Sequence, residues 1–185
     1  MEFQERAQTI LGELREVFSR IDEESVLRLM AMIDEAPRVF LIGAGREGLA
    51  TRSLAMRLMH YGKQAHWAWD DTTPGVAPGD LFLITSGSGQ IGHIHYVAEE
   101  VRRAGARIAL VTGSPSGKTA ALADHVLFVP ASVYKGTDPM VPSIQPMGNL
   151  FEQALFLLFD MVTMMLAEGS DTPYAAMAAR HRNFE

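Results

Sequence analysis

The sequence predicts an α/β fold in which a parallel β-sheet is covered by helices on both faces. Five short segments are apolar almost throughout, which is typical of buried strands: 38–42, 65–69, 81–85, 107–112 and 125–130. Helix-length segments separate most of them. Strands that are apolar on both sides and alternate with helices indicate a parallel sheet between two helical layers.

Helices are expected at both ends of the chain as well as between the strands. Apolar residues recur every three or four positions over 3–21, and a second helical pattern covers 23–36. The remaining helical segments are 48–61, 91–104 and a long apolar one over 147–168. Its most apolar stretch, 154–166, is too short to span a bilayer and carries Asp160, so we expect a buried helix. Residues 171–185 are more polar and predict a C-terminal arm.

Length and composition favour one soluble domain over residues 1–185, with N-terminal helices over about 2–36. Hydrophobic residues make up 48% of the 185 residues and charged residues 21%. The absence of cysteine excludes disulfides, thiolate catalysis and cysteine-ligated metals. A net charge of −6 argues against a nucleic-acid partner. The first residues resemble no signal peptide, so we expect a cytoplasmic protein with no membrane partner.

A glycine-rich turn at 43–48 has the spacing G-x-G-x-x-G directly after the first strand. Together with Asp70 near the end of the second strand, this spacing is compatible with dinucleotide binding. The alternative is that a tight strand-to-helix turn needs glycine for its backbone conformation. Glu47 lies inside the turn and disfavours a bound pyrophosphate, because both are negatively charged.

A second glycine-rich turn, Ser86-Gly87-Ser88-Gly89, follows the third strand and precedes a helix. Hydroxyls, accessible backbone N–H groups and a helix N-terminus together favour an anion. An ordinary capping turn is the alternative. Ligands of such sheets bind beyond the carboxyl ends of the strands, so both turns can face one site.

Several motifs in order resemble the SIS (sugar isomerase) domain family and, within it, most closely the 6-phospho-3-hexuloisomerases. They are GAGR, AMRLMHYG, DDTTP, SGSG, QPMGNLFEQ and RHRNFE, and the similarity runs from about residue 5 to the C-terminus. The resemblance implies a flavodoxin-like three-layer α/β/α sandwich with a five-stranded parallel sheet. It also implies a homotetramer that interconverts 3-hexulose 6-phosphate and fructose 6-phosphate without a metal or redox cofactor. The expected partners are thus a small sugar or sugar phosphate and further copies of the chain.

The resemblance assigns roles to individual residues. It makes Glu152 the base that moves a proton through an enediol, and His60 a candidate for proton transfer, within one subunit or across a subunit boundary. Arg46 would hold the substrate or polarise its oxygen. Structural alternatives exist for each, such as a glutamate favoured by the helix dipole or a surface ion pair. The substrate-binding residues implied are Ser86, Gly87, Ser88, Gly89, Thr72, Thr73 and His181, and Glu47 is expected among them.

The chain departs from the family pattern at two positions near the expected phosphate. Glu47 replaces the serine of GAGRSG, and Ile91 stands where a threonine is usual. A carboxylate that faced the phosphate would repel it, whereas one that faced another substrate could receive a hydroxyl or a cation. The alternatives are therefore an isomerase of an unphosphorylated or differently charged ketose, or a non-catalytic SIS protein that binds a sugar phosphate.

Metal binding is not expected from the histidines. His93 and His95 are two positions apart, which places their side chains on different faces of a helix. No third ligand is evident in the sequence beside them.

Overall fold

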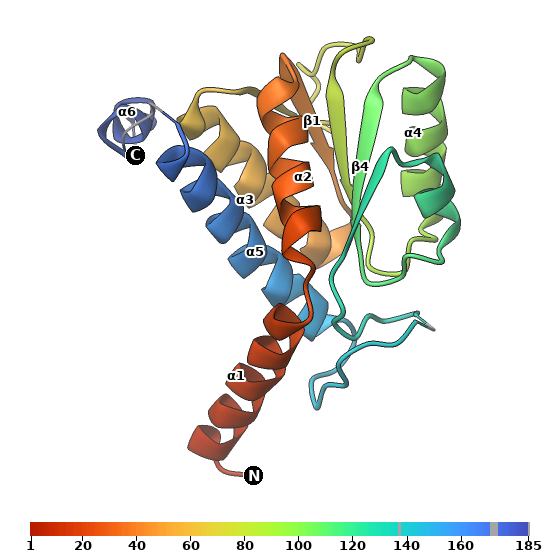
Figure 1. The fold of residues 1–185 in the computed structure, drawn as a ribbon, viewed down its shortest axis with the longest axis vertical. Helices are drawn as coiled ribbons and strands as arrows, with labels where there is room; N and C mark the ends of the chain where they lie inside the picture. The colour runs from red at the N-terminus through yellow and green to blue at the C-terminus, as the bar shows by residue number, and fades with distance from the viewer. Residues whose placement is uncertain (137, 171–173, 185) are drawn as a thin grey trace.

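The structure is a computed structural model that describes residues 1–136, 138–170 and 174–184 (Figure 1). Its elements in chain order are α1 (Phe3–Ser19), α2 (Glu23–Glu35), β1 (Arg38–Ile42), α3 (Gly45–Tyr61), β2 (Gln64–Trp67), β3 (Leu81–Thr85), α4 (Gly92–Arg103), β4 (Arg107–Thr112), the 3-10 helix η1 (Lys118–Leu122), β5 (His125–Phe128), α5 (Asn149–Glu168) and α6 (Tyr174–Ala179).

The five strands form one parallel sheet in the order β2-β1-β3-β4-β5, which confirms the predicted fold class. Strand order reverses between β1 and β3, and ligands of open α/β sheets bind at such a switch point. Two predicted strands were too long at their ends. β2 stops at Trp67, where a turn begins with the Asp70 N–H donating to the Trp67 carbonyl, and β5 stops before Pro130, which has no N–H to donate.

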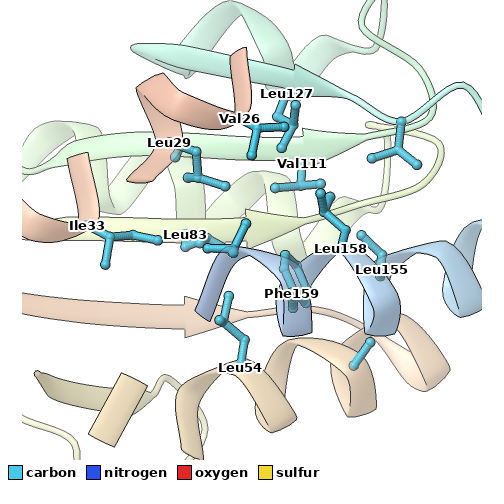
Figure 2. Close-up of a cluster of buried hydrophobic side chains, with 14 of the residues drawn as sticks. Val26, Leu29, Ile33, Leu54, Leu83, Val111, Leu127, Leu155, Leu158 and Phe159 are labelled. Carbon is cyan, nitrogen blue, oxygen red and sulfur yellow. The ribbon is translucent and has the colours of Figure 1, made fainter. Parts of the chain in front are cut away.

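Helices cover both faces of the sheet. One core cluster joins the sheet to α2, α3 and α5, and a smaller one joins its other face to α4 and η1. Figure 2 shows side chains of α5 pointing toward β3 and β4, between those of α2 and α3. The labelled residues of α5 are Leu155, Leu158 and Phe159, and those of the strands are Leu83, Val111 and Leu127.

Helix α5 is the buried helix that the sequence predicts. By length and composition it could cross a membrane, but 56% of its most apolar window is buried inside the domain. Packing against the sheet and α3 therefore accounts for its apolar sequence.

Helix α1 projects from the domain, and only its C-terminal part joins the core (Figure 1). Val17 is buried, whereas Phe3 is 78% exposed. The Glu13 carboxylate accepts hydrogen bonds from the Ser143 hydroxyl at 2.6 Å and the Ile144 N–H at 2.7 Å. These bonds fasten the loop that leads into α5, and so help to place the first turn of that helix.

The C-terminal arm returns to α3. Arg180 Nη1 donates to the His60 carbonyl at 2.9 Å and to the Tyr61 carbonyl at 3.4 Å, at the C-terminus of α3. Residues 171–173 and 185 of the predicted arm lie outside the described residues.

Candidate functional site

The glycine turn between β1 and α3 owes its two outer glycines to close packing. A Cβ at Gly43 would lie 2.3 Å from the Thr85 hydroxyl oxygen, and a Cβ at Gly48 would lie 2.6 Å from the Gly43 carbonyl oxygen. No larger residue fits either position without moving backbone. The G-x-G-x-x-G spacing is thus explained by the contact of α3 with β1 and β3, without a dinucleotide.

The first turn of α3 also brings Glu47 to the second glycine turn. The Gly87 N–H donates to Glu47 Oε2 at 3.0 Å, across the switch point between β1 and β3. A Cβ at Gly87 would lie 2.7 Å from Glu47 Oε1. Both carboxyl oxygens therefore lie against Gly87, and Glu47 points inward, toward the predicted anion-binding turn.

The Ser86–Gly89 turn is held rigidly from the neighbouring strand. The Thr112 hydroxyl donates to the Ser86 carbonyl at 2.6 Å, and the Gly113 N–H donates to the Gly87 carbonyl at 3.1 Å. The Ser86 hydroxyl is fully buried and has no hydrogen-bond partner among the described residues. The backbone of the turn is thus fixed, its Gly87 and Gly89 N–H groups donate to Glu47 and to the Ser86 carbonyl, and the Ser86 hydroxyl is left without a partner among the described residues.

Glu152 lies in the first turn of α5 and contacts Arg46 of α3. Arg46 Nε donates to Glu152 Oε2, and the Glu152 side chain is 14% exposed. Phe151, its neighbour, approaches the other glycine turn, because a Cβ at Gly87 would lie 3.3 Å from Phe151 Cδ1. The predicted base and the predicted anion site therefore meet at one end of the domain.

Burial raises the pKa of Glu47 to about 7, although the hydrogen bond from Gly87 acts in the opposite direction. The nearby negative charge of Glu152 contributes to the increase. Near neutral pH, Glu47 is therefore divided between its neutral and its charged form.

A cavity of about 690 Å³ opens beside Glu47, and its lining includes Ser88 and Ile91 from the second glycine turn and the start of α4. The described residues that line it are Glu47, Ser88, Gln90, Ile91, Tyr134, Lys135 and Gly136. Glu152 is not among them, but it contacts Arg46, the residue before Glu47, and its charge acts on Glu47. The volume is large enough for a sugar phosphate.

Sequence reasoning missed Tyr134 and Lys135. They belong to the segment after β5, and Lys135 is the cation among the described lining residues. The Lys135 ammonium lies 5.5 Å from the centre of the Tyr134 ring. Their position just beyond the carboxyl end of the last strand is the signal that could have identified them.

His60 and His181 lie in a different cavity, of about 490 Å³, between the C-terminus of α3 and the arm. Their rings stack with centroids 5.2 Å apart, and His60 is buried. His60 lies thirteen positions after Glu47, which is about 20 Å along α3. Figure 1 shows α6 at the far end of α3 and α5 from the starts of these helices. Within one chain, the structure does not bring either histidine to Glu152.

Thr73 also lies away from Glu47. Its hydroxyl donates to the Trp67 carbonyl at 2.7 Å, and the residue lines a third cavity together with Trp69 and Val97. Thr72 is exposed in the same loop after β2. The hydrogen bond of Thr73 matches the turn chemistry that is the alternative to a role in sugar binding.

The histidines of α4 have other neighbours. His95 Nδ1 lies 3.2 Å from the Thr119 hydroxyl, and the His93 ring lies 6.5 Å from that of Trp69. Over residues 1–136, 138–170 and 174–184, no group of three His, Asp or Glu side chains is placed to hold a metal ion.

The chain is similar to known proteins over almost its whole length. The model of the SIS domain matches residues 32–157. The chain is 40% identical over 176 residues to a Mycobacterium gastri protein named 3-hexulose-6-phosphate isomerase, covering 95% of this chain and 88% of that protein. It is 36% identical to a Bacillus subtilis protein of the same name, covering 95% of both chains.

A solved structure shows the same fold. It is a Methanococcus jannaschii protein described as having an inferred molecular function of 3-hexulose-6-phosphate isomerase. Its TM-score is 0.85 at 24% identity, and the match covers 98% of this chain and 99% of that chain.

Proposed function

The chain belongs to the SIS domain family, and from that premise we propose that it interconverts 3-hexulose 6-phosphate and fructose 6-phosphate. Its relatives of 40% and 36% identity, matched over almost their whole lengths, carry the name of this isomerase. For this chain, the proposal is supported by the position of Glu152 relative to the second glycine turn. The largely buried Glu152 carboxylate, held by Arg46, stands at the same end of the domain as the Ser86–Gly89 turn.

The reaction moves a carbonyl between neighbouring carbons and needs no oxidant. Glu152 takes the proton from C2 of 3-hexulose 6-phosphate, which gives a 2,3-enediolate with its negative charge on the oxygen at C3. The proton of the C2 hydroxyl passes to that oxygen, the carbonyl forms at C2, and Glu152 returns its proton to C3. A positioned carboxylate suits this transfer because it accepts and donates the same proton in turn.

Arg46 supplies the positive charge for the developing oxyanion. Its guanidinium is exposed on one side and contacts Glu152 on the other, so it can reach a substrate oxygen close to the base. His60 and His181 would take part only if another subunit brought its own cavity to this site. We propose that the two histidines act in this way in the assembled protein. We further propose that the isomerase needs no cofactor and works in the cytoplasm.

Oligomerisation is proposed as well, with a tetramer as the assembly. Apolar side chains on α3 and α5 are exposed to solvent in the single chain: Leu49, Met56, Leu157, Met161 and Met164. An exposed apolar face of this kind is typical of a protein–protein interface. We assign it to a second copy of the chain.

The test is Glu152→Gln, which keeps the shape of the side chain and removes the base. We expect turnover of fructose 6-phosphate to fall by about 10²–10⁴-fold, as loss of a general base does. Incorporation of solvent deuterium into the product, followed by NMR, should fall with it. Glu168→Gln, an exposed position at the other end of α5, is the control. Turnover that survives in Glu152→Gln with the correct fold would contradict the proposal.

An unphosphorylated ketose is the second candidate substrate, because Glu47 already occupies the Gly87 N–H. Activity of the wild-type protein on free and phosphorylated ketoses separates the two candidates. A higher kcat/KM for the free sugar at every pH would favour the second.

A further inference from the structure

The Glu47 carboxyl group occupies the position at which an anion would approach Gly87. Its Oε2 accepts the Gly87 N–H at 3.0 Å, and its Oε1 lies against the Gly87 Cα, where a Cβ would come within 2.7 Å. Gly87 is itself buried, and Glu47, Val133 and Phe151 are the side chains nearest to the place that its Cβ would take. A substrate phosphate and the Glu47 carboxylate therefore compete for one donor.

The charged groups around Glu47 do not cancel its charge. Glu152 of α5 adds a negative charge, and Arg46 of α3 is engaged by Glu152. Lys135, after β5, lines the same cavity and is exposed, and its ammonium lies near the Tyr134 ring. The remaining described residues that line the cavity are uncharged. Lys135 can meet a phosphate, but Glu47 in its charged form repels it.

The neutral form of Glu47 has different chemistry. A protonated carboxyl group carries one O–H donor, so it can donate to a phosphate oxygen instead of repelling it. Because burial raises the pKa of Glu47 to about 7, the neutral form is substantially populated in the neutral range of pH. When protonated, Glu47 can thus donate a hydrogen bond to the phosphate. When ionised, it competes with the phosphate for the Gly87 N–H.

We propose that Glu47 sets the phosphate selectivity of the isomerase: a sugar phosphate binds to the form in which this carboxyl is neutral, and the carboxylate excludes it from Gly87. The inference rests on the proposed function, because it concerns the phosphate end of the same substrate. Binding of the phosphate dianion above neutral pH is then accompanied by uptake of one proton, which adds to Glu47.

The kinetic test compares the wild-type protein with Glu47→Gln between pH 6 and pH 9, with fructose 6-phosphate as substrate. The ratio of the two KM values cancels the ionisation of the substrate's own phosphate, which has a pKa near 6. For a carboxyl that titrates at about 7, we expect the ratio of wild-type KM to variant KM to rise about tenfold between pH 6 and pH 8. The ratio of the wild-type kcat to the variant kcat should stay constant over this range of pH.

A second variant and a control sharpen the comparison. Glu47→Ser should behave like Glu47→Gln, because both side chains are neutral donors. Glu24→Gln, at an exposed position on α2, should keep the wild-type profile. Parallel KM profiles for the wild-type protein and Glu47→Gln would overturn the inference, as would a higher KM for Glu47→Gln at every pH.

Calorimetry of the wild-type protein separates this inference from the proposed function. Fructose 6-phosphate is titrated at pH 8 in two buffers of different ionisation enthalpy, which reports the protons taken up. Uptake close to one proton supports the inference even if no turnover is found, in which case the proposed function fails alone. Binding at pH 8 without proton uptake overturns the inference even if turnover is observed.

Discussion

Two glutamates in the first turns of two helices show how differently one side chain can be used. Glu152 of α5 contacts the guanidinium of Arg46, whereas Glu47 of α3 accepts a hydrogen bond from the Gly87 N–H and faces a second negative charge. The contact with a guanidinium suits the proposed role of Glu152 as a base. Burial beside a like charge instead raises the pKa of Glu47 to about 7, so both of its forms are present near neutral pH.

The raised pKa of Glu47 predicts a pH-dependent loss of stability. The folded protein binds more protons than the unfolded chain between about pH 4.5 and 7, so the free energy of unfolding falls as pH rises through this range and levels off above it. The loss from this one group is at most about 3 kcal/mol, and less where solvent reaches the carboxyl.

Urea denaturation at pH 5 and pH 8 measures this effect. Glu47→Gln should be stabilised relative to the wild-type protein more at pH 8 than at pH 5, because glutamine carries no charge to bury. The free energy of unfolding of Glu24→Gln should differ from that of the wild-type protein by the same small amount at both values of pH. If the Glu47→Gln difference is independent of pH, the folded protein does not hold Glu47 near its neutral form.

At the scale of elements, α5 joins the core to the site. Its first turn carries Glu152, its inner side packs on the sheet, and its outer side leaves apolar groups exposed. The apolar composition and the length of the stretch predicted a buried helix here. The sequence did not show which side of the helix stays exposed, since an almost uniformly apolar helix has no evident polar face.

Two phenylalanines on α5 distinguish its two sides. Phe159 packs among α2, α3 and the sheet (Figure 2) and is 1% exposed, whereas Phe156 is 42% exposed. Phe159→Ala should lower the free energy of unfolding by about 3–5 kcal/mol, because it leaves a cavity in the core. Phe156→Ala should cost about 0.5 kcal/mol in the isolated chain. Equal losses in urea denaturation would mean that the two positions are buried alike, as they would be if Phe156 lies in an interface.

At the scale of the whole molecule, apolar residues of α3 and α5 face solvent, and the fold of a single chain gives no reason for their exposure. Leu49 and Met164 are more than half exposed, yet they lie on the two helices that frame the candidate site. The cavity with His60 and His181 lies at the far end of the same helices. An assembly through this face would bury the apolar groups.

The assembly is tested with Met161→Glu, which places a charge in the apolar face of α5. We expect the sedimentation coefficient to fall to that of a smaller species, because burial of an unpaired carboxylate opposes association. Leu27→Glu, at a similarly exposed position on α2, is the control and should retain the wild-type assembly. A wild-type protein that sediments as a monomer would exclude the assembly altogether.

The amino-acid sequence by itself determined the parallel α/β fold, the order of its elements and the motif that carries Glu152. These follow from local properties: apolar periodicity, glycine at tight turns and short runs of specific residues. Tertiary structure alone decided that Glu47 turns inward to Gly87, that Lys135 joins the cavity, and that His60 and Thr73 lie elsewhere within the chain. Such outcomes depend on distances between residues far apart in the chain, which are set by how helices pack on the sheet and not by spacing along the sequence.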